Sequence, residues 1–155
     1  MKKIFLIYGE ITLVSDEDFI FLSGYDWRLK ENRRVVCSGG YVDGINSRLI
    51  HRIIAKRAGI DCTNEIDHID RNPLNNQREN LRAATRSQNS MNSKIPVTNT
   101  SGYKGVYWRK ERKKWYAKIR VGDSAFYLGS FTTPEEASEA YNKAADHYFG
   151  EFASY

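Results

Sequence analysis

The chain has 155 residues, of which 41% are hydrophobic and 28% charged, and this composition is typical of a globular protein. No apolar run approaches the roughly 20 residues of a membrane-spanning helix, and no cleavage site follows the short basic start, so we expect neither a membrane contact nor a signal peptide. Cys37 and Cys62 are the only cysteines, which excludes a four-cysteine structural zinc site. Two lone thiols suit a reducing cytoplasm, although one disulfide between them stays open.

The net charge of +5 is unevenly distributed along the sequence. Residues 71–120 contain thirteen Lys and Arg against two acidic residues, whereas the remainder of the chain is acidic. A basic centre between acidic flanks favours a polyanionic partner that one region of the protein contacts. A solvated charged face is the alternative, and charge alone does not decide between the two.

The first sixty residues are expected to form short strands and two helices. Residues 4–14 and 27–48 read as short strands, and the residues after Ser15 read as a short helix that Ser15 caps. A second helix is expected over residues 47–59, because its apolar residues recur at helical spacing and a glycine closes it.

The segment from Glu65 to Asn89 combines carboxylates, a histidine, asparagines and arginines with few apolar residues. It begins like a strand, continues as a turn and ends as loop and short helix. Hydrolysis of a phosphodiester needs a base for water, a Lewis acid and positive groups for the backbone. His68 suits the base, because the unperturbed pKa of histidine is about 6.5, and Asp67 and an asparagine amide are hard oxygen ligands suited to Mg²⁺ or Mn²⁺. The side chains expected to hold phosphates are Arg71, Arg78, Arg82 and Arg86.

Simpler interpretations exist for several of these polar residues. The asparagines read equally well as turn residues and caps: Asn75, Asn76 and Asn80. Asp70 is expected to stabilise the turn rather than to act as a third ligand, and His51 to pack in a helix. His147 suits the end of a helix and is assigned no catalytic role.

The run "LIHRIIA…IDHIDRNPLNNQRENLRAATRSQNSMN", from about Leu49 to Asn92, resembles the HNH endonuclease family, in the branch of phage and intron-encoded homing endonucleases. The resemblance implies a ββα-metal unit, in which two strands and a helix surround one divalent ion, Mg²⁺ or Mn²⁺. The implied roles are a general base for His68, a metal ligand for Asp67, and orientation of the histidine for Asn80. Asn89 takes the place of the last motif histidine and would be the second, weakly binding metal ligand.

The C-terminal third of the sequence differs in character from the rest. Residues 93–101 are polar and read as a linker. Three aromatic-rich runs then read as antiparallel strands, and residues 133–150 read as one helix with Thr133 as N-cap and Pro134 at the first helical position. Strict alternation puts basic and aromatic side chains on the sheet face away from the helix.

Residues 102–153 resemble the AP2 DNA-binding domain of plant transcription factors, on the runs "YKGV", "WYAKIR" and "LGSFTTPEEASEAY". The resemblance implies that this sheet face contacts the DNA major groove. The residues at DNA-contacting positions are Lys104, Tyr107, Arg109, Lys118, Arg120 and Tyr127. Several arginines and a tryptophan of the plant family are replaced here, so its base preference does not transfer, and a solvated sheet face is the alternative.

We therefore expect an α+β protein with two domains. An HNH endonuclease domain occupies residues 1–92, with its ββα-metal core at about 49–92, and residues 93–101 form a linker. An AP2-like domain of three antiparallel strands and one helix occupies residues 102–155. The expected function is that of a metal-dependent, site-directed, homing-type endonuclease that nicks double-stranded DNA. It would act as a monomer without a protein partner, in the cytoplasm, which is that of the host bacterium if a phage encodes the chain. The main alternative is a DNA-binding regulator with an inactive HNH motif, and a further one is an RNA-directed nuclease.

Overall fold

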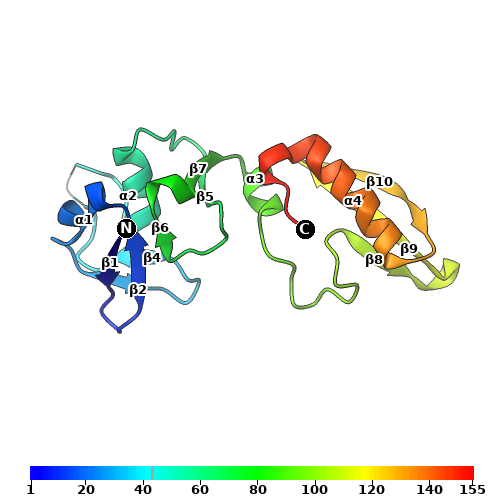
Figure 1. Ribbon diagram of the computed structural model, residues 1–155, viewed down its shortest axis with the longest axis horizontal. Coiled ribbons are helices and arrows are strands. Elements are labelled where there is room, and N and C mark those ends of the chain that lie inside the picture. The colour runs from blue at the N-terminus through cyan, green and yellow to red at the C-terminus, as the bar shows by residue number, and fades with distance from the viewer. Residues whose placement is uncertain (43) are drawn as a thin grey trace. The chain divides into compact units, whose positions relative to one another are not determined.

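The computed structural model describes residues 1–42 and 44–155, and its internal contacts define two compact units, Met1–Thr85 and Arg86–Tyr155 (Figure 1). Both units combine helices with small sheets, so the mixed α and β content expected from the sequence is confirmed. No helix in the described ranges has the length and apolar character needed to span a membrane.

The first unit consists of short elements wrapped around one apolar core. Its elements are β1 (Lys2–Phe5), β2 (Ile11–Val14), α1 (Asp16–Leu22), β3 (Trp27–Leu29), β4 (Val35–Cys37), α2 (Ile50–Arg57), β5 (Glu65–His68), β6 (Asn75–Asn76), the 3-10 turn η1 (Arg78–Asn80) and β7 (Leu81–Ala84). Helix α2 is central, because Ile50, Ile53 and Ile54 are fully buried on its inner face. It ends before Gly59, whose φ of +74° a glycine adopts without strain.

Three small sheets organise the first unit. Strands β1 and β2 form an antiparallel hairpin, and the two residues of β6 add to β2 in parallel, with Leu13 opposite Asn75. Strands β3 and β4 pair with each other, as do β5 and β7. The β2–β6 pairing has a consequence for the site, because it ties the N-terminal hairpin to the loop that follows His68.

The second unit is a three-stranded sheet covered by one long helix. Its elements are α3 (Arg86–Met91), β8 (Val106–Arg109), η2 (Lys110–Arg112), β9 (Lys114–Val121), β10 (Ser124–Phe131), α4 (Pro134–Phe149) and η3 (Gly150–Phe152). The antiparallel sheet has the order β10-β9-β8, and α4 runs alongside its strands (Figure 1). The Thr133 hydroxyl accepts from the Glu136 N–H in a capping box, with Pro134 in the first turn, so the predicted helix start is confirmed.

Three local features differ from the expectations or settle an alternative. Ser15 precedes α1, but its hydroxyl makes no cap hydrogen bond there. Residues 81–84, expected as loop, form strand β7. Cys37 and Cys62 are both free thiols, so the disulfide left open by the sequence is absent.

The polar segment 93–101 lies within the second compact unit, and the expected domain boundaries stay a prediction.

Candidate active site and nucleic-acid interface

The β5–β7 hairpin carries the two adjacent residues Asp67 and His68. Alternation along β5 gives them different surroundings. Asp67 is 5% exposed, and its Oδ2 lies 3.0 Å from Nε of Arg82, the residue opposite it on β7. Arg82, expected to hold a phosphate, therefore forms an ion pair with the predicted metal ligand.

His68 is half-buried, and its ring is held by an asparagine. Nε2 of His68 lies 3.0 Å from Oδ1 of Asn76 on β6. The ring of His51, on α2, meets the His68 ring edge-on at 5.4 Å between centroids. The two imidazoles thus come from α2 and β5, and His51 packs in the helix as the sequence indicated.

Burial keeps both histidines neutral near pH 7. It lowers the pKa of His68, and this effect outweighs the Asn76 hydrogen bond and the nearby carboxylates of Asp70 and Asp67, which raise it. Burial, followed by repulsion from His68 and two arginines, lowers the pKa of His51 to about 3. A neutral imidazole at position 68 can accept a proton, which is what a general base requires.

Asn80 makes contacts other than those expected. Its Oδ1 accepts from the Asp70 N–H at 3.0 Å, and its Nδ2 donates to Asp70 Oδ1 at 2.9 Å and to the Asn75 carbonyl at 2.7 Å. Asn80 therefore closes the loop between β5 and β6, whereas Asn76 contacts the His68 ring. Asp70 accepts several of these bonds, so it stabilises the turn as the sequence indicated, and its pKa is lowered by them although burial opposes the shift. A catalytic contribution of Asn80 stays a prediction.

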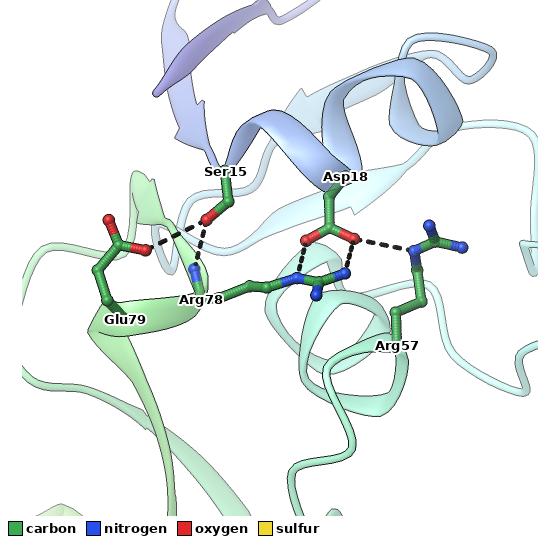
Figure 2. A network of polar contacts seen from close by, with 5 residues as sticks. All are labelled: Ser15, Asp18, Arg57, Arg78 and Glu79. Atoms are coloured by element: carbon green, nitrogen blue, oxygen red, sulfur yellow. Dashed lines mark hydrogen bonds and ion pairs between the residues drawn. The ribbon is translucent and has the colours of Figure 1, made fainter.

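Arg78 has a structural role in this fold, and its expected contact with a phosphate stays a prediction. Figure 2 shows its guanidinium on the fully buried carboxylate of Asp18, with Nε and Nη2 at 2.7 and 2.8 Å from the two oxygens. Nε of Arg57 reaches the same carboxylate at 2.9 Å. Burial alone would raise the pKa of Asp18, but the hydrogen bonds from Arg78 and Arg57 hold it below its ordinary value.

Ser15 completes this network beside Arg78. Its hydroxyl accepts from the Arg78 N–H at 2.8 Å and donates to Glu79 at 3.3 Å (Figure 2). The hydroxyl that the sequence assigned to the start of α1 thus anchors η1 instead. The network fastens the N-terminal helix to the segment that leads into β7.

The remaining predicted residues of the motif are exposed or lie in the second unit. Arg71 is exposed, with a φ of +61° at the turn after β5 and its N–H donated to the His68 carbonyl. Arg86 is exposed at the start of α3, and Asn89 is half-buried on the same helix. Asp67 and His68 belong to the first unit and Asn89 to the second, so its role as a metal ligand stays a prediction.

The donor chemistry of the first unit is compatible with a divalent ion. Among residues 1–42 and 44–155, no three His, Cys, Asp or Glu side chains are grouped as a metal site. Mg²⁺ nevertheless needs few protein ligands, because it is usually bound through one or two carboxylates and keeps several waters. Asp67 is a carboxylate of this kind in the first unit, and its role as a metal ligand stays a prediction.

The sheet of the second unit has an apolar face and a basic, aromatic face. Val106, Ala117 and Ile119 are almost fully buried towards α4. The opposite face carries a row of tyrosines, with Tyr107 stacked on Tyr116 at 5.3 Å and Tyr116 on Tyr127 at 6.4 Å. Cations on this face include Arg109, which lies 4.9 Å over the Tyr116 ring, and the exposed Lys118 and Arg120. The predicted division into two faces is confirmed along β9, whereas a register shift between Tyr127 and Gly129 interrupts the alternation in β10.

A basic cavity of about 920 Å³ opens beside this face within the second unit. Its lining includes five cations against one acid: Arg86, Lys94, Lys104, Lys118, Arg120 and Asp123. Three serine hydroxyls on or just after α3 also border it: Ser87, Ser90 and Ser93. Lys94 lies in the segment expected to be a linker, and a single lysine in a polar segment did not predict a place in a basic cavity. The cavity combines cations with hydroxyls, which suits an anionic ligand.

Lys104 differs from the other cations of this cavity. Its ammonium donates to the Met91 carbonyl at 2.6 Å and to the Ser154 hydroxyl. These bonds connect α3 to the C-terminal residues, so Lys104 has a structural task in addition to any contact with DNA.

Comparisons with known proteins found one matching family model and several similar proteins. A model of the HNH endonuclease family matches residues 48–91. Protein 3.8 of Escherichia phage T7 is 58% identical over 54 residues, which are 35% of this chain and 45% of that protein. An AP2-like ethylene-responsive transcription factor of Oryza sativa subsp. japonica is 46% identical over 52 residues, which are 32% of this chain and 8% of that protein.

A third relative matches over nearly the whole chain. An uncharacterized HNH endonuclease of Acanthamoeba polyphaga mimivirus is 32% identical over 150 residues, which are 94% of this chain and 74% of that protein. A match of this extent covers most of both compact units, including the Asp67–His68 strand. The chain therefore belongs to the HNH endonuclease family.

Proposed function

We propose that this protein is a divalent-metal-dependent endonuclease that hydrolyses phosphodiester bonds in double-stranded DNA. The observation that supports this most is the pair on β5 in a member of the HNH family: a half-buried, neutral His68 beside the buried carboxylate of Asp67. The family generally uses a divalent ion, and its nuclease activity implies DNA as the substrate.

The chemistry follows from what these side chains can do. His68 takes a proton from the attacking water as a general base. Asp67 and Asn89 would hold the ion, which when bound supplies Lewis-acid stabilisation of the charge that develops on the phosphate oxygens. Arg71 and Arg86 are exposed cations at either end of the motif and suit contacts with the DNA backbone. Arg82 acts on Asp67, whose carboxylate it orients through their ion pair.

The second unit is the DNA-binding part of this proposal. Its tyrosine row and the cations beside it present stacking surfaces and positive charge on one sheet face. A sheet can place such a face against bases and phosphates in the major groove, and the similarity to the plant AP2-like protein supports this use. One active site per chain favours a nick per binding event, and DNA binding by the second unit suits a site-directed, homing-type enzyme.

Cleavage of supercoiled plasmid tests the proposal. The purified protein with Mg²⁺ or Mn²⁺ should convert supercoiled DNA to the nicked form, and EDTA should stop this conversion. His68→Ala should lower the rate by about 10²- to 10⁴-fold, which is the contribution of a general base. His147→Ala is the matched control, because His147 is an exposed histidine on α4 and its loss should leave the rate unchanged.

Three results would contradict the proposal. Equal rates for His68→Ala and the wild type would remove His68 from the chemistry. Tight binding without cleavage of plasmid or source-genome DNA would favour a regulator with an inactive motif. Faster cleavage of RNA than of duplex DNA would favour an RNA-directed nuclease.

A further inference from the structure

Thr12 lies 56 positions before His68 in the sequence, yet it takes part in the hydrogen bonds that hold the histidine ring. It is fully buried on β2, where the parallel pairing with β6 brings it against Asn76. Nδ2 of Asn76 donates to Oγ1 of Thr12 at 2.8 Å, and Asn76 is itself completely buried. A chain of three side chains, Thr12, Asn76 and His68, thus runs from the N-terminal hairpin to the proposed base.

Each hydrogen bond in this chain has a defined direction. The only hydroxyl hydrogen of Thr12 is donated to the Leu74 carbonyl at 2.9 Å, so Oγ1 accepts from Asn76. The Asn76 amide also donates to the Pro73 carbonyl at 3.1 Å, and both of its hydrogens are thereby used. Its carbonyl oxygen must therefore face His68, and a neutral His68 must donate to it from Nε2.

The opposite orientation of the Asn76 amide is unfavourable. Rotating it by 180° would place its oxygen against the Pro73 carbonyl, two acceptors without a hydrogen between them, at a fully buried position. A buried polar group that loses its partner costs about 1–3 kcal/mol. The backbone on both sides is also fixed, because the Leu13 N–H donates to the Leu74 carbonyl at 2.8 Å.

We propose that Thr12 and Asn76 are positioning residues that fix His68 in the tautomer with its proton on Nε2, so that Nδ1 is the atom that accepts the proton from water. This inference rests on the proposed function for its catalytic meaning, but the tautomer itself is a property of the folded protein. It gives the N-terminal hairpin a task, because Thr12 lies outside the region 48–91 that the family model matches. A wrong tautomer is costly in catalysis, since it presents an N–H where a lone pair is required.

Nitrogen NMR of the full-length, metal-free protein measures the tautomer directly. The ¹⁵N shifts of a neutral imidazole differ for the nitrogen with and without the proton, and the chain has only three histidines to assign. At about pH 8, His68 should show its proton on Nε2. A proton on Nδ1 in the wild type would overturn the proposal without any variant.

A pair of variants tests the role of the Thr12 hydroxyl. Thr12→Val keeps the shape but removes the acceptor, so the His68 signals should change to a mixture of tautomers and nicking should slow by about tenfold, within the range of a positioned base. Thr12→Ser restores the hydroxyl and should restore both readouts. Thr63→Val is the matched control, because the Thr63 hydroxyl donates to Asp61 at the exposed surface of the same unit, and it should change neither.

The outcomes separate this inference from the proposed function. If the wild type shows the Nε2 tautomer but His68→Ala nicks DNA as fast as the wild type, the hydrogen-bond chain is supported and the role of His68 in cleavage is excluded. If His68→Ala loses nicking but Thr12→Val has the same His68 signals as the wild type, the proposed nuclease function is supported and the positioning role of Thr12 is excluded. Circular dichroism of each variant confirms that it is folded before it is compared.

Discussion

At the scale of single residues, the partner of a side chain decides its role more than its type does. Arg71, Arg78 and Arg82 occur within twelve positions of one basic motif. Arg71 is exposed, Arg78 binds a buried aspartate, and Arg82 binds the predicted metal ligand. One of the three therefore remains a straightforward candidate for contact with a DNA phosphate.

Asp18 offers a test of this structural use of arginine. Asp18→Asn keeps the volume but leaves Arg57 and Arg78 without their fully buried carboxylate, so the free energy of unfolding should fall by about 2 kcal/mol. This is less than for a pair buried on both sides, because the arginines are about 30% exposed. Urea unfolding at pH 7 measures the change, and Glu17→Gln, an exposed acid on the same helix, is the control that should change it little.

The same ion pairs make stability depend on acid pH. The pKa of Asp18 is lowered in the folded protein from its ordinary value of 3.8. The stabilisation is therefore complete above about pH 4 and is lost as pH falls through the lowered pKa. The difference in unfolding free energy between the wild type and Asp18→Asn should shrink below pH 4, and a difference that stays constant would assign the effect to packing rather than to charge.

At the scale of elements, the second unit depends on close approach between α4 and its sheet. Gly105 precedes β8 with a φ of +63°, and a Cβ there would overlap the Tyr141 ring and the Lys118 carbonyl. Tyr141 is buried on α4, and burial raises the pKa of its hydroxyl to about 12. The absence of a side chain at position 105 thus lets the helix and β9 meet.

Gly105→Ala should therefore destabilise the second unit more than an ordinary glycine replacement does. Gly102→Ala is the matched control, since Gly102 also has a positive φ, +78°, but no atom lies within 4 Å of the added Cβ. We expect Gly105→Ala to cost about 1–3 kcal/mol more than the control, which is the usual range for overpacking. Thermal unfolding followed by tyrosine and tryptophan fluorescence would show it, and equal melting temperatures would mean that Tyr141 moves aside without cost.

At the scale of the whole molecule, the proposed division of labour places chemistry in one unit and most DNA affinity in the other. The first unit holds Asp67 and His68, whereas the tyrosine row and the basic cavity lie in the second. Because phosphate contacts release counterions, their loss changes the salt dependence of binding as well as the affinity.

Two cations on the sheet face test this division in the intact protein. Lys118→Gln combined with Arg120→Gln should weaken DNA binding and reduce the slope of log K against log salt by about two. Lys143→Gln removes an exposed charge from α4, where it pairs with Glu139, and should change the slope by less than one. Fluorescence anisotropy with labelled duplex DNA at several salt concentrations measures both, and an unchanged slope in the double variant would exclude this face as the main contact.

Local features of this protein could be predicted from its sequence because they depend on neighbours along the chain. The start of α4 at Thr133, the split of β9 into an apolar and a basic face, and the adjacency of Asp67 and His68 on a strand are of this kind. Each depends on the 3.6- or two-residue period, or on caps a few positions away.

The tertiary structure decided which side chains meet across large separations in the sequence. Asp18 reaches Arg78 across 60 positions, and Thr12 reaches Asn76 across 64. No local period specifies such contacts, because they arise only when β6 packs on β2 and η1 packs beneath α1. The sequence by itself determined the family of the site and the residues that could do its chemistry. The packing of the N-terminal hairpin placed Asn76 against His68, with both amide hydrogens bonded elsewhere and the amide oxygen facing the ring. The amide oxygen of Asn80 instead accepts from the Asp70 N–H, so Asn80 does not take this position.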